Sequence, residues 1–105
     1  MKPQTYQLSP TADQDLVDIW TCSAQHWGKA QANQYLKDLE ACFLSLLQTP
    51  TLGRQRPEVR QGYASICQHK HMIFYRIHRQ NIEIIRVLHQ RMDIIHHVSN
   101  HQEDS

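Results

Sequence analysis

The sequence predicts an α+β domain in which an N-terminal strand and an antiparallel helical hairpin pack on a small antiparallel β-sheet. Three observations support this fold class. Apolar residues recur at helical spacing through the first half of the chain. A glycine divides that helical pattern into two parts. The second half holds three short β-prone runs that are separated by short polar connections.

The length and composition indicate one globular domain. The chain has 105 residues, with 40% hydrophobic and 20% charged residues. We assign residues 1–98 to the domain and expect residues 99–105 to form a flexible polar tail. No apolar run has the roughly 20 residues of a membrane span, and the N-terminus lacks the apolar core of a signal peptide. We therefore expect a cytoplasmic protein without a membrane partner.

The first half begins with a short β-prone run at residues 5–8. Ser9 then serves as a helix N-cap, and Pro10 occupies the first helical position. Gly28 is the expected stop. The apolar stripe of this helix consists of Ala12, Leu16, Ile19, Trp20 and Trp27.

A second helical pattern follows and ends near Thr49, because Pro50 disfavours helix at the residue before it. Two amphipathic helices joined by a glycine break form an antiparallel hairpin. The apolar stripe of the second helix consists of Ala32, Tyr35, Leu36, Leu39, Cys42, Phe43, Leu46 and Leu47.

The second half begins with a loop and continues as strands. Residues 50–62 contain two prolines, two glycines and three arginines, which predicts a basic loop. Three β-prone runs follow at residues 63–67, 72–77 and 82–88. Connections of this length suit hairpins, so the runs predict an antiparallel meander.

Side-chain alternation assigns the strand residues to two faces. In the middle run, one face carries Ile73, Tyr75 and Ile77, and the other carries Met72, Phe74 and Arg76. In the last run, Ile85 and Val87 are expected opposite a set formed by Ile82, Ile84, Arg86 and Leu88. The hairpin can cover one face, and the other face, which mixes arginines with apolar residues, is typical of an interaction surface.

Charge is unevenly distributed along the chain. Residues 1–53 carry three lysines and five carboxylates, whereas residues 54–93 carry eight lysines or arginines and three carboxylates. The basic second half favours an acidic partner, either nucleic acid or an acidic protein segment. A solvated sheet face explains the same pattern equally well.

The cysteines and histidines do not form a recognisable metal motif. Cys22, Cys42 and Cys67 include no CxxC pair, and reduced cysteines are the default in a cytosolic domain. His69 and His71 could share a strand face, yet the eight histidines lack zinc-ligand spacing. We therefore expect no metal and no cofactor.

These pieces together resemble the ParE branch of the ParE/RelE toxin superfamily over residues 6 to about 98. The most specific segment is residues 84–93, Ile-Ile-Arg-Val-Leu-His-Gln-Arg-Met-Asp, with His97 following. The ordered set also includes Leu8-Ser9-Pro10, Ala12, Asp15-Leu16, Ile19, Trp27-Gly28, Gln31-Ala32, Tyr35, Pro50, Gly53, Arg56 and Ile73-Phe74-Tyr75-Arg76.

The resemblance implies the toxin component of a type II toxin–antitoxin system that acts on DNA gyrase by trapping its cleaved-DNA complex. It also implies a ParD-like antitoxin whose C-terminal segment wraps the toxin and whose other end carries a ribbon-helix-helix DNA-binding domain. The toxin would then reach DNA only indirectly, through gyrase or through the antitoxin.

Two alternatives stay open. RelE-like relatives cleave mRNA on the ribosome, which requires an acid, a base and cations for the phosphate. The arginines and His89 could supply these groups, although the segment around His89 is more similar to the ParE type. A toxin fold that only binds an antitoxin is the second alternative. We expect a protein inhibitor rather than an enzyme.

Candidate residues follow from these expectations. The target-binding candidates are Arg56, Arg60, Arg76, Arg86, His89 and Arg91. Arg86 and His89 have a structural alternative, in which Asp93 pairs with Arg86 or Arg91. The antitoxin-binding candidates are Trp20, Trp27, Met72 and Phe74, with core packing as the alternative for all four. Unpaired sheet edges also allow a homodimer, besides a toxin–antitoxin hetero-oligomer.

Overall fold

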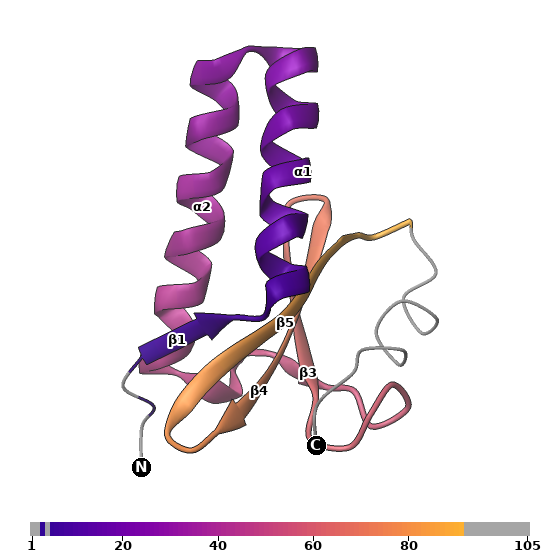
Figure 1. Cartoon of the computed structure of the whole chain (residues 1–105). Helices are drawn as coiled ribbons and strands as arrows, with labels where there is room; N and C mark the ends of the chain where they lie inside the picture. Colours follow the sequence, from indigo (N-terminus) through magenta and orange to yellow (C-terminus); the bar gives the residue numbers. More distant parts are fainter. Residues whose placement is uncertain (1–2, 4, 92–105) are drawn as a thin grey trace.

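A computed structural model describes residue 3 and residues 5–91, which form a helical hairpin standing on a small sheet (Figure 1). The tip of the hairpin projects away from the sheet. The expected tail at residues 99–105 lies outside the described residues. The elements are β1 (Thr5–Leu8), α1 (Pro10–Trp27), α2 (Lys29–Gln48), the 3₁₀ helix η1 (Pro50–Leu52), β2 (Arg54–Gln55), β3 (Ala64–Gln68), β4 (His71–His78) and β5 (Asn81–His89).

The hairpin begins where the sequence predicts. The Ser9 hydroxyl accepts a hydrogen bond from the Ala12 N–H at 2.9 Å, as an N-cap does. The same hydroxyl donates to the Ile85 carbonyl at 2.8 Å, so the cap also fastens α1 to β5. Gly28 separates the helices with φ of 93°, a conformation that glycine adopts without strain. Neither helix, nor any other in the described range, is long and apolar enough to cross a membrane.

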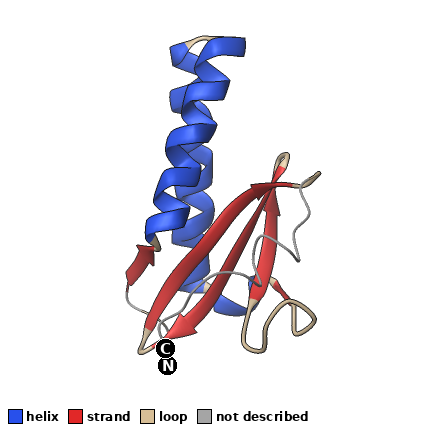
Figure 2. Cartoon of the chain, turned by 45° about the vertical axis from the view of Figure 1, so that its right-hand side comes forward, coloured by secondary structure: helices blue, strands red, loops and turns tan. Residues whose placement is uncertain are grey.

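The predicted α+β class is confirmed, with one correction to the sheet. Figure 2 shows the strands together beneath the helices, in the order β1-β5-β4-β3-β2. β3, β4 and β5 form the predicted antiparallel meander. β1 runs parallel to β5, so the sheet is mixed. No tight turn links these two strands, and local sequence therefore does not determine their relative direction. The segment expected as a loop also contains η1 and the edge strand β2.

Each face of the sheet supports a core. Leu39, Phe43 and Leu46 of α2 pack with Ile73 and Tyr75 between the hairpin and the sheet. A second cluster on the other side consists of Val59, Tyr63, Phe74, Ile85 and Leu88, with Met72 packed against it. Because Val59 and Tyr63 come from the segment before β3, that segment folds over the face expected to be an interaction surface.

A β-bulge changes the predicted alternation in β5. Phe74 pairs with Arg86 and the next residue, Tyr75, pairs with Ile84, which leaves Ile85 as an extra residue. The prediction that Ile85 and Val87 share a face is therefore wrong. The cluster under the hairpin contains Ile82, Ile84 and Val87, whereas Ile85 and Leu88 belong to the second cluster.

Candidate interaction site

The Arg56 side chain is largely buried against the second core and is not exposed on the surface. Its side chain is 14% exposed, and its Nε lies 2.6 Å from Glu58 Oε2. Nη1 donates to Ser65 Oγ at 3.0 Å, and the guanidinium lies 5.5 Å from the centre of the Phe74 ring. The hydrogen bond from Arg56 lowers the pKa of Glu58. Arg56 thus fastens the segment before β3 to the sheet.

Arg76 and Arg86 are also held by carboxylates. Arg76 Nε lies 2.6 Å from Glu83 Oε1 on the neighbouring strand, with both side chains 27% exposed. Arg86 donates Nε and Nη2 to the two oxygens of Asp15 at 2.8 and 2.9 Å. The geometry is bidentate and joins β5 to α1. The positive charge of each of these arginines is therefore offset within the chain.

The remaining target-binding candidates lie nearer the surface. Arg60 is exposed, and its backbone N–H donates to the Arg56 carbonyl at 3.2 Å. Arg91 is exposed, and its backbone N–H donates to His89 Nδ1 at 3.2 Å. His89 is half-buried at the end of β5, edge-on to His71 at 5.5 Å. The expected pairing of Asp93 lies outside the described residues.

The antitoxin-binding candidates divide by exposure. Trp20 is half-buried and donates Nε1–H to Asn33 Oδ1 at 2.8 Å, which links α1 to α2. Phe74 is fully buried and Met72 packs beside it in the second core. Trp27 is 72% exposed, so among these four its ring is the most available to a partner.

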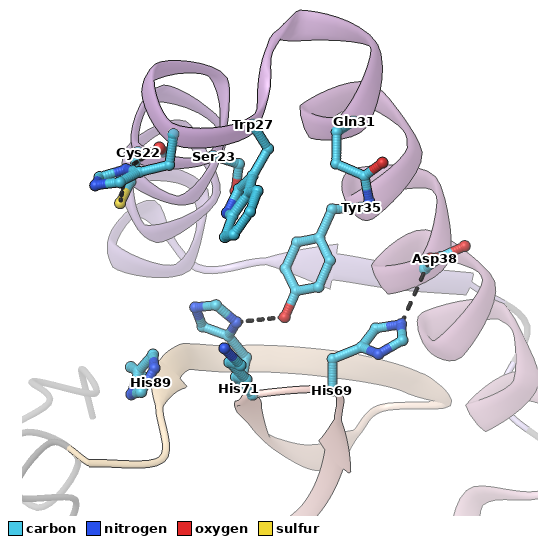
Figure 3. Close-up of a pocket in the computed structure, with 11 residues that line it drawn as sticks. Cys22, Ser23, Trp27, Gln31, Tyr35, Asp38, His69, His71 and His89 are labelled. Atoms are coloured by element: carbon cyan, nitrogen blue, oxygen red, sulfur yellow. Dashed lines mark hydrogen bonds and ion pairs between the residues drawn. The ribbon is translucent and has the colours of Figure 1, made fainter.

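A cavity that the sequence did not predict lies between the hairpin and the β3–β4 turn, the start of β4 and the end of β5 (Figure 3). Its volume is about 690 Å³. The Trp27 ring points into it from the hairpin, above Tyr35. The lining residues are Cys22, Ser23, His26, Trp27, Gln31, Tyr35, Asp38, His69, Lys70, His71 and His89.

Tyr35 and His71 form the floor of this cavity. The Tyr35 hydroxyl and His71 Nδ1 are 2.5 Å apart, which ties α2 to the start of β4. Burial and the neighbouring His89 lower the pKa of His71 to about 4, while Asp15 opposes the shift. Burial also raises the pKa of Tyr35. Both groups are therefore neutral at neutral pH, and the bond joins two uncharged partners.

Two further histidines line the cavity, one from the β3–β4 turn and one from α1. His69 Nε2 is 3.5 Å from Asp38 Oδ2, and its ring centre is 5.4 Å from that of Tyr35. His26 Nδ1 is 2.8 Å from the Cys22 carbonyl in the last turn of α1. Within residues 3 and 5–91, no group of three or more His, Cys, Asp or Glu is placed to hold a metal ion. The arrangement suits recognition by aromatic packing and hydrogen bonding.

Sequence comparison places the chain among toxins. A family model described as "ParE toxin of type II toxin-antitoxin system, parDE" matches residues 6–94. Toxin ParE1 of Mycobacterium tuberculosis is 41% identical over 90 residues, which cover 85% of this chain and 92% of the relative. Toxin ParE1 of Caulobacter vibrioides is 42% identical over 98 residues, covering 93% and 99%.

Structural comparison finds the same fold in two toxin–antitoxin systems. A chain of the chromosomal ParDE toxin–antitoxin system from P. aeruginosa has a TM-score of 0.72 at 19% identity, covering 82% of this chain and 95% of its own. A chain of the toxin–antitoxin complex RelBE2 from Mycobacterium tuberculosis has a TM-score of 0.60 at 22% identity, covering 84% and 99%. At these identities the two structures establish a shared fold.

Proposed function

Because the chain belongs to the ParE toxin family of type II toxin–antitoxin systems, we propose that it inhibits DNA gyrase and that a ParD-like antitoxin neutralises it. In this proposal the toxin acts in the cytoplasm, binds gyrase without turnover and limits growth when the antitoxin is absent. DNA is contacted only through gyrase or through the antitoxin.

The ion pairs between three arginines and nearby carboxylates support a protein that binds its target over one that cleaves RNA. Arg56, Arg76 and Arg86 each have a carboxylate within 2.8 Å. Cleavage of RNA needs cations directed at the phosphate, together with an acid and a base. Cations already neutralised by Glu58, Glu83 and Asp15 are poorly suited to that role. Arg60, Arg91 and His89 stay candidates for contact with gyrase.

Neutralisation is proposed to work by covering overlapping surface. The structural neighbour from P. aeruginosa is described as part of a ParDE system, and the second neighbour as a toxin–antitoxin complex. We infer that the antitoxin of this chain lays a helix or an added strand against the toxin, with Trp27 as an anchor. The resulting assembly is a hetero-oligomer, and a toxin homodimer through a sheet edge is a separate possibility.

A supercoiling assay tests the function. Purified toxin should inhibit supercoiling by gyrase and accumulate cleaved DNA, and toxin pre-mixed with its antitoxin should do neither. Degradation of mRNA in a translating extract, with gyrase still active, would instead establish the RelE-like ribonuclease alternative. Harmless expression of the folded toxin without antitoxin would establish a non-toxic antitoxin-binding module.

A further inference from the structure

The hairpin tip, which we define as residues 20–34, stands clear of the protein core (Figure 1). None of these residues, all of which the structure describes, belongs to the cluster that packs between the hairpin and the sheet. Within the tip the two helices are joined to each other by the hydrogen bond from Trp20 to Asn33. The Asp15 carboxylate that fastens α1 to β5 lies about 18 Å from Trp27 along the helix axis. Segments with few buried apolar contacts to the rest of a domain move at a low cost in free energy.

Two contacts of α2 support the tip at its base. The Tyr35 hydroxyl lies 2.5 Å from His71 Nδ1 at the start of β4. Asp38 Oδ2 lies 3.5 Å from His69 Nε2 in the β3–β4 turn, and their side chains are 37% and 53% exposed. An ion pair with that much exposure contributes little stability, so the Tyr35–His71 contact is the stronger of the two restraints. The end of α1, with Trp27, lies across the cavity from β4 (Figure 3).

Movement of the tip onto the sheet would bury apolar surface. Trp27 is 72% exposed, and its ring points into the cavity of about 690 Å³ that separates the tip from the β3–β4 turn. Burial of an aromatic ring of this size is favourable. The fixed charges in the lining, Lys70 and Asp38, are of opposite sign, and burial favours the neutral forms of His71 and Tyr35. Closure therefore brings no pair of like fixed charges of the lining together.

We propose that the hairpin tip is a lid that bends where it leaves the core, closes on the β3–β4 turn and buries Trp27 in the cavity. The bend lies beside Ile19 and Tyr35, the residues of the core cluster and its margin that are nearest the tip in the sequence. Closure distorts the contact between Tyr35 and His71, because α2 moves with the tip, so this contact holds the lid open. The closed form hides Trp27, and a partner that uses Trp27 as an anchor therefore binds the open form. Lid motion is a property of the toxin alone and does not depend on the protein that the toxin inhibits.

A disulfide across the cavity tests the lid. Cys22 lines the cavity from α1 and Lys70 lines it from the β3–β4 turn, and a disulfide forms only when the two Cα atoms come within about 7 Å of each other. The variant is the full-length chain with Lys70→Cys and Cys67→Ser, the second of which removes the other exposed thiol. Mild oxidation at low protein concentration should link positions 22 and 70 in most molecules. Addition of Tyr35→Phe should raise the rate of linkage by about fivefold, because the hydrogen bond to His71 no longer opposes closure.

The fluorescence of Trp27 shows whether linkage closes the lid. In a Trp20→Phe background Trp27 is the remaining tryptophan. Linkage should move its emission to shorter wavelength and lower its quenching by acrylamide about twofold or more, because the ring leaves the solvent. Reduction of the disulfide should reverse both changes, and thermal melts of the reduced variants should confirm that each is folded.

His78→Cys in the same Cys67→Ser background is the matched control, because His78 is exposed at the end of β4 and is not among the described residues that line the cavity. It should link to Cys22 at least about tenfold more slowly than Lys70→Cys does. The lid is overturned if folded Lys70→Cys does not link, if it links no faster than the control, or if Trp27 is as accessible after linkage as before. Gyrase and antitoxin are absent from both measurements, so each of these results leaves the proposed inhibition of gyrase in place.

Discussion

Asp15 on α1 and Arg86 on β5 form a bidentate ion pair with side chains only 11% and 15% exposed. Asp15 Oδ2 also accepts the Val87 backbone N–H at 2.9 Å. One carboxylate therefore fixes both the side chain and the backbone of β5 against the start of the helical hairpin. Arg86, which the sequence suggested for target binding, therefore stabilises the fold.

Removal of Asp15 should destabilise the protein strongly. Asp15→Ala leaves the Arg86 guanidinium with no carboxylate partner in a mostly buried position, and we expect a loss of about 2–4 kcal/mol in unfolding free energy. Urea denaturation measures this change. Asp18→Ala is the matched control, because Asp18 is exposed on the same helix, and should change stability by no more than about 0.5 kcal/mol. A similarly small effect for Asp15→Ala would contradict the assigned role.

The turn between α2 and β2 depends on Tyr75. Its hydroxyl donates to the Pro50 carbonyl at 2.8 Å and accepts the Gly53 N–H at 2.9 Å. Tyr75→Phe removes both bonds and should cost about 1–2 kcal/mol by chemical denaturation. Tyr6→Phe is the control, since the Tyr6 hydroxyl has only a 3.5 Å contact with Glu40. An equal effect of the two substitutions would argue against this assignment.

Gly53 is constrained by the same contact. A Cβ at this position would lie 2.8 Å from the Ser65 carbonyl oxygen and closer still to the Tyr75 hydroxyl. Gly53→Ala should therefore destabilise the protein by more than Tyr75→Phe does, in the same denaturation measurement. Gly53→Ala in the Tyr75→Phe background should cost less than it does alone, because the hydroxyl is gone. Additive costs would show that the clash is with the Tyr75 ring carbon and the Ser65 carbonyl, which both stay in place in Tyr75→Phe.

Local signals in the sequence predicted most element boundaries. Ser9 with Pro10, Gly28 and Pro50 marked the ends of the helices because each imposes a backbone requirement at its own position. Long-range features were harder to predict. The extra residue at Ile85 has no local signature in the sequence. The parallel pairing of β1 with β5 depends on the path of the chain between residues 8 and 81.

The surroundings of the predicted interaction residues could not be predicted for a related reason. Arginine counts along the sequence do not reveal which carboxylate lies opposite, and Asp15 is 71 residues from Arg86. Trp27 was identified, but its histidine-lined surroundings come from both helices, from the β3–β4 turn and from the ends of β4 and β5. A pattern within one segment of the sequence therefore does not predict such a cavity.

The β4–β5 turn offers a stabilising substitution. Arg79 and Gln80 have φ of 51° and 66°, values that side chains adopt at a cost. A two-residue hairpin with both φ values positive favours Asn-Gly. Arg79→Asn with Gln80→Gly should therefore raise the unfolding free energy by about 1 kcal/mol. Gln61→Asn, which places Asn before the existing Gly62 outside a two-residue hairpin, is a control for the Asn-Gly sequence itself and should not raise the stability. Lower stability after the change at the β4–β5 turn would contradict the prediction.

Stability should fall in acid partly because of His71. Its pKa is about 4 in the folded protein, against 6.5 for the ordinary group. Between these values the unfolded chain binds more protons, so the contribution of neutral His71 is complete above pH 6.5 and is lost as pH falls toward about 4. His71→Phe should flatten the dependence of unfolding free energy on pH in this window. His78→Gln, at an exposed position, should follow the wild type.

The most direct test of the central claim is a titration of toxin against a fixed amount of gyrase, with supercoiling and cleaved DNA measured together. A binder without turnover should reach full inhibition near one toxin per target site, with cleaved DNA rising in proportion. Full gyrase activity at a large excess of folded toxin, alongside mRNA cleavage by catalytic amounts of the same preparation, would contradict the account.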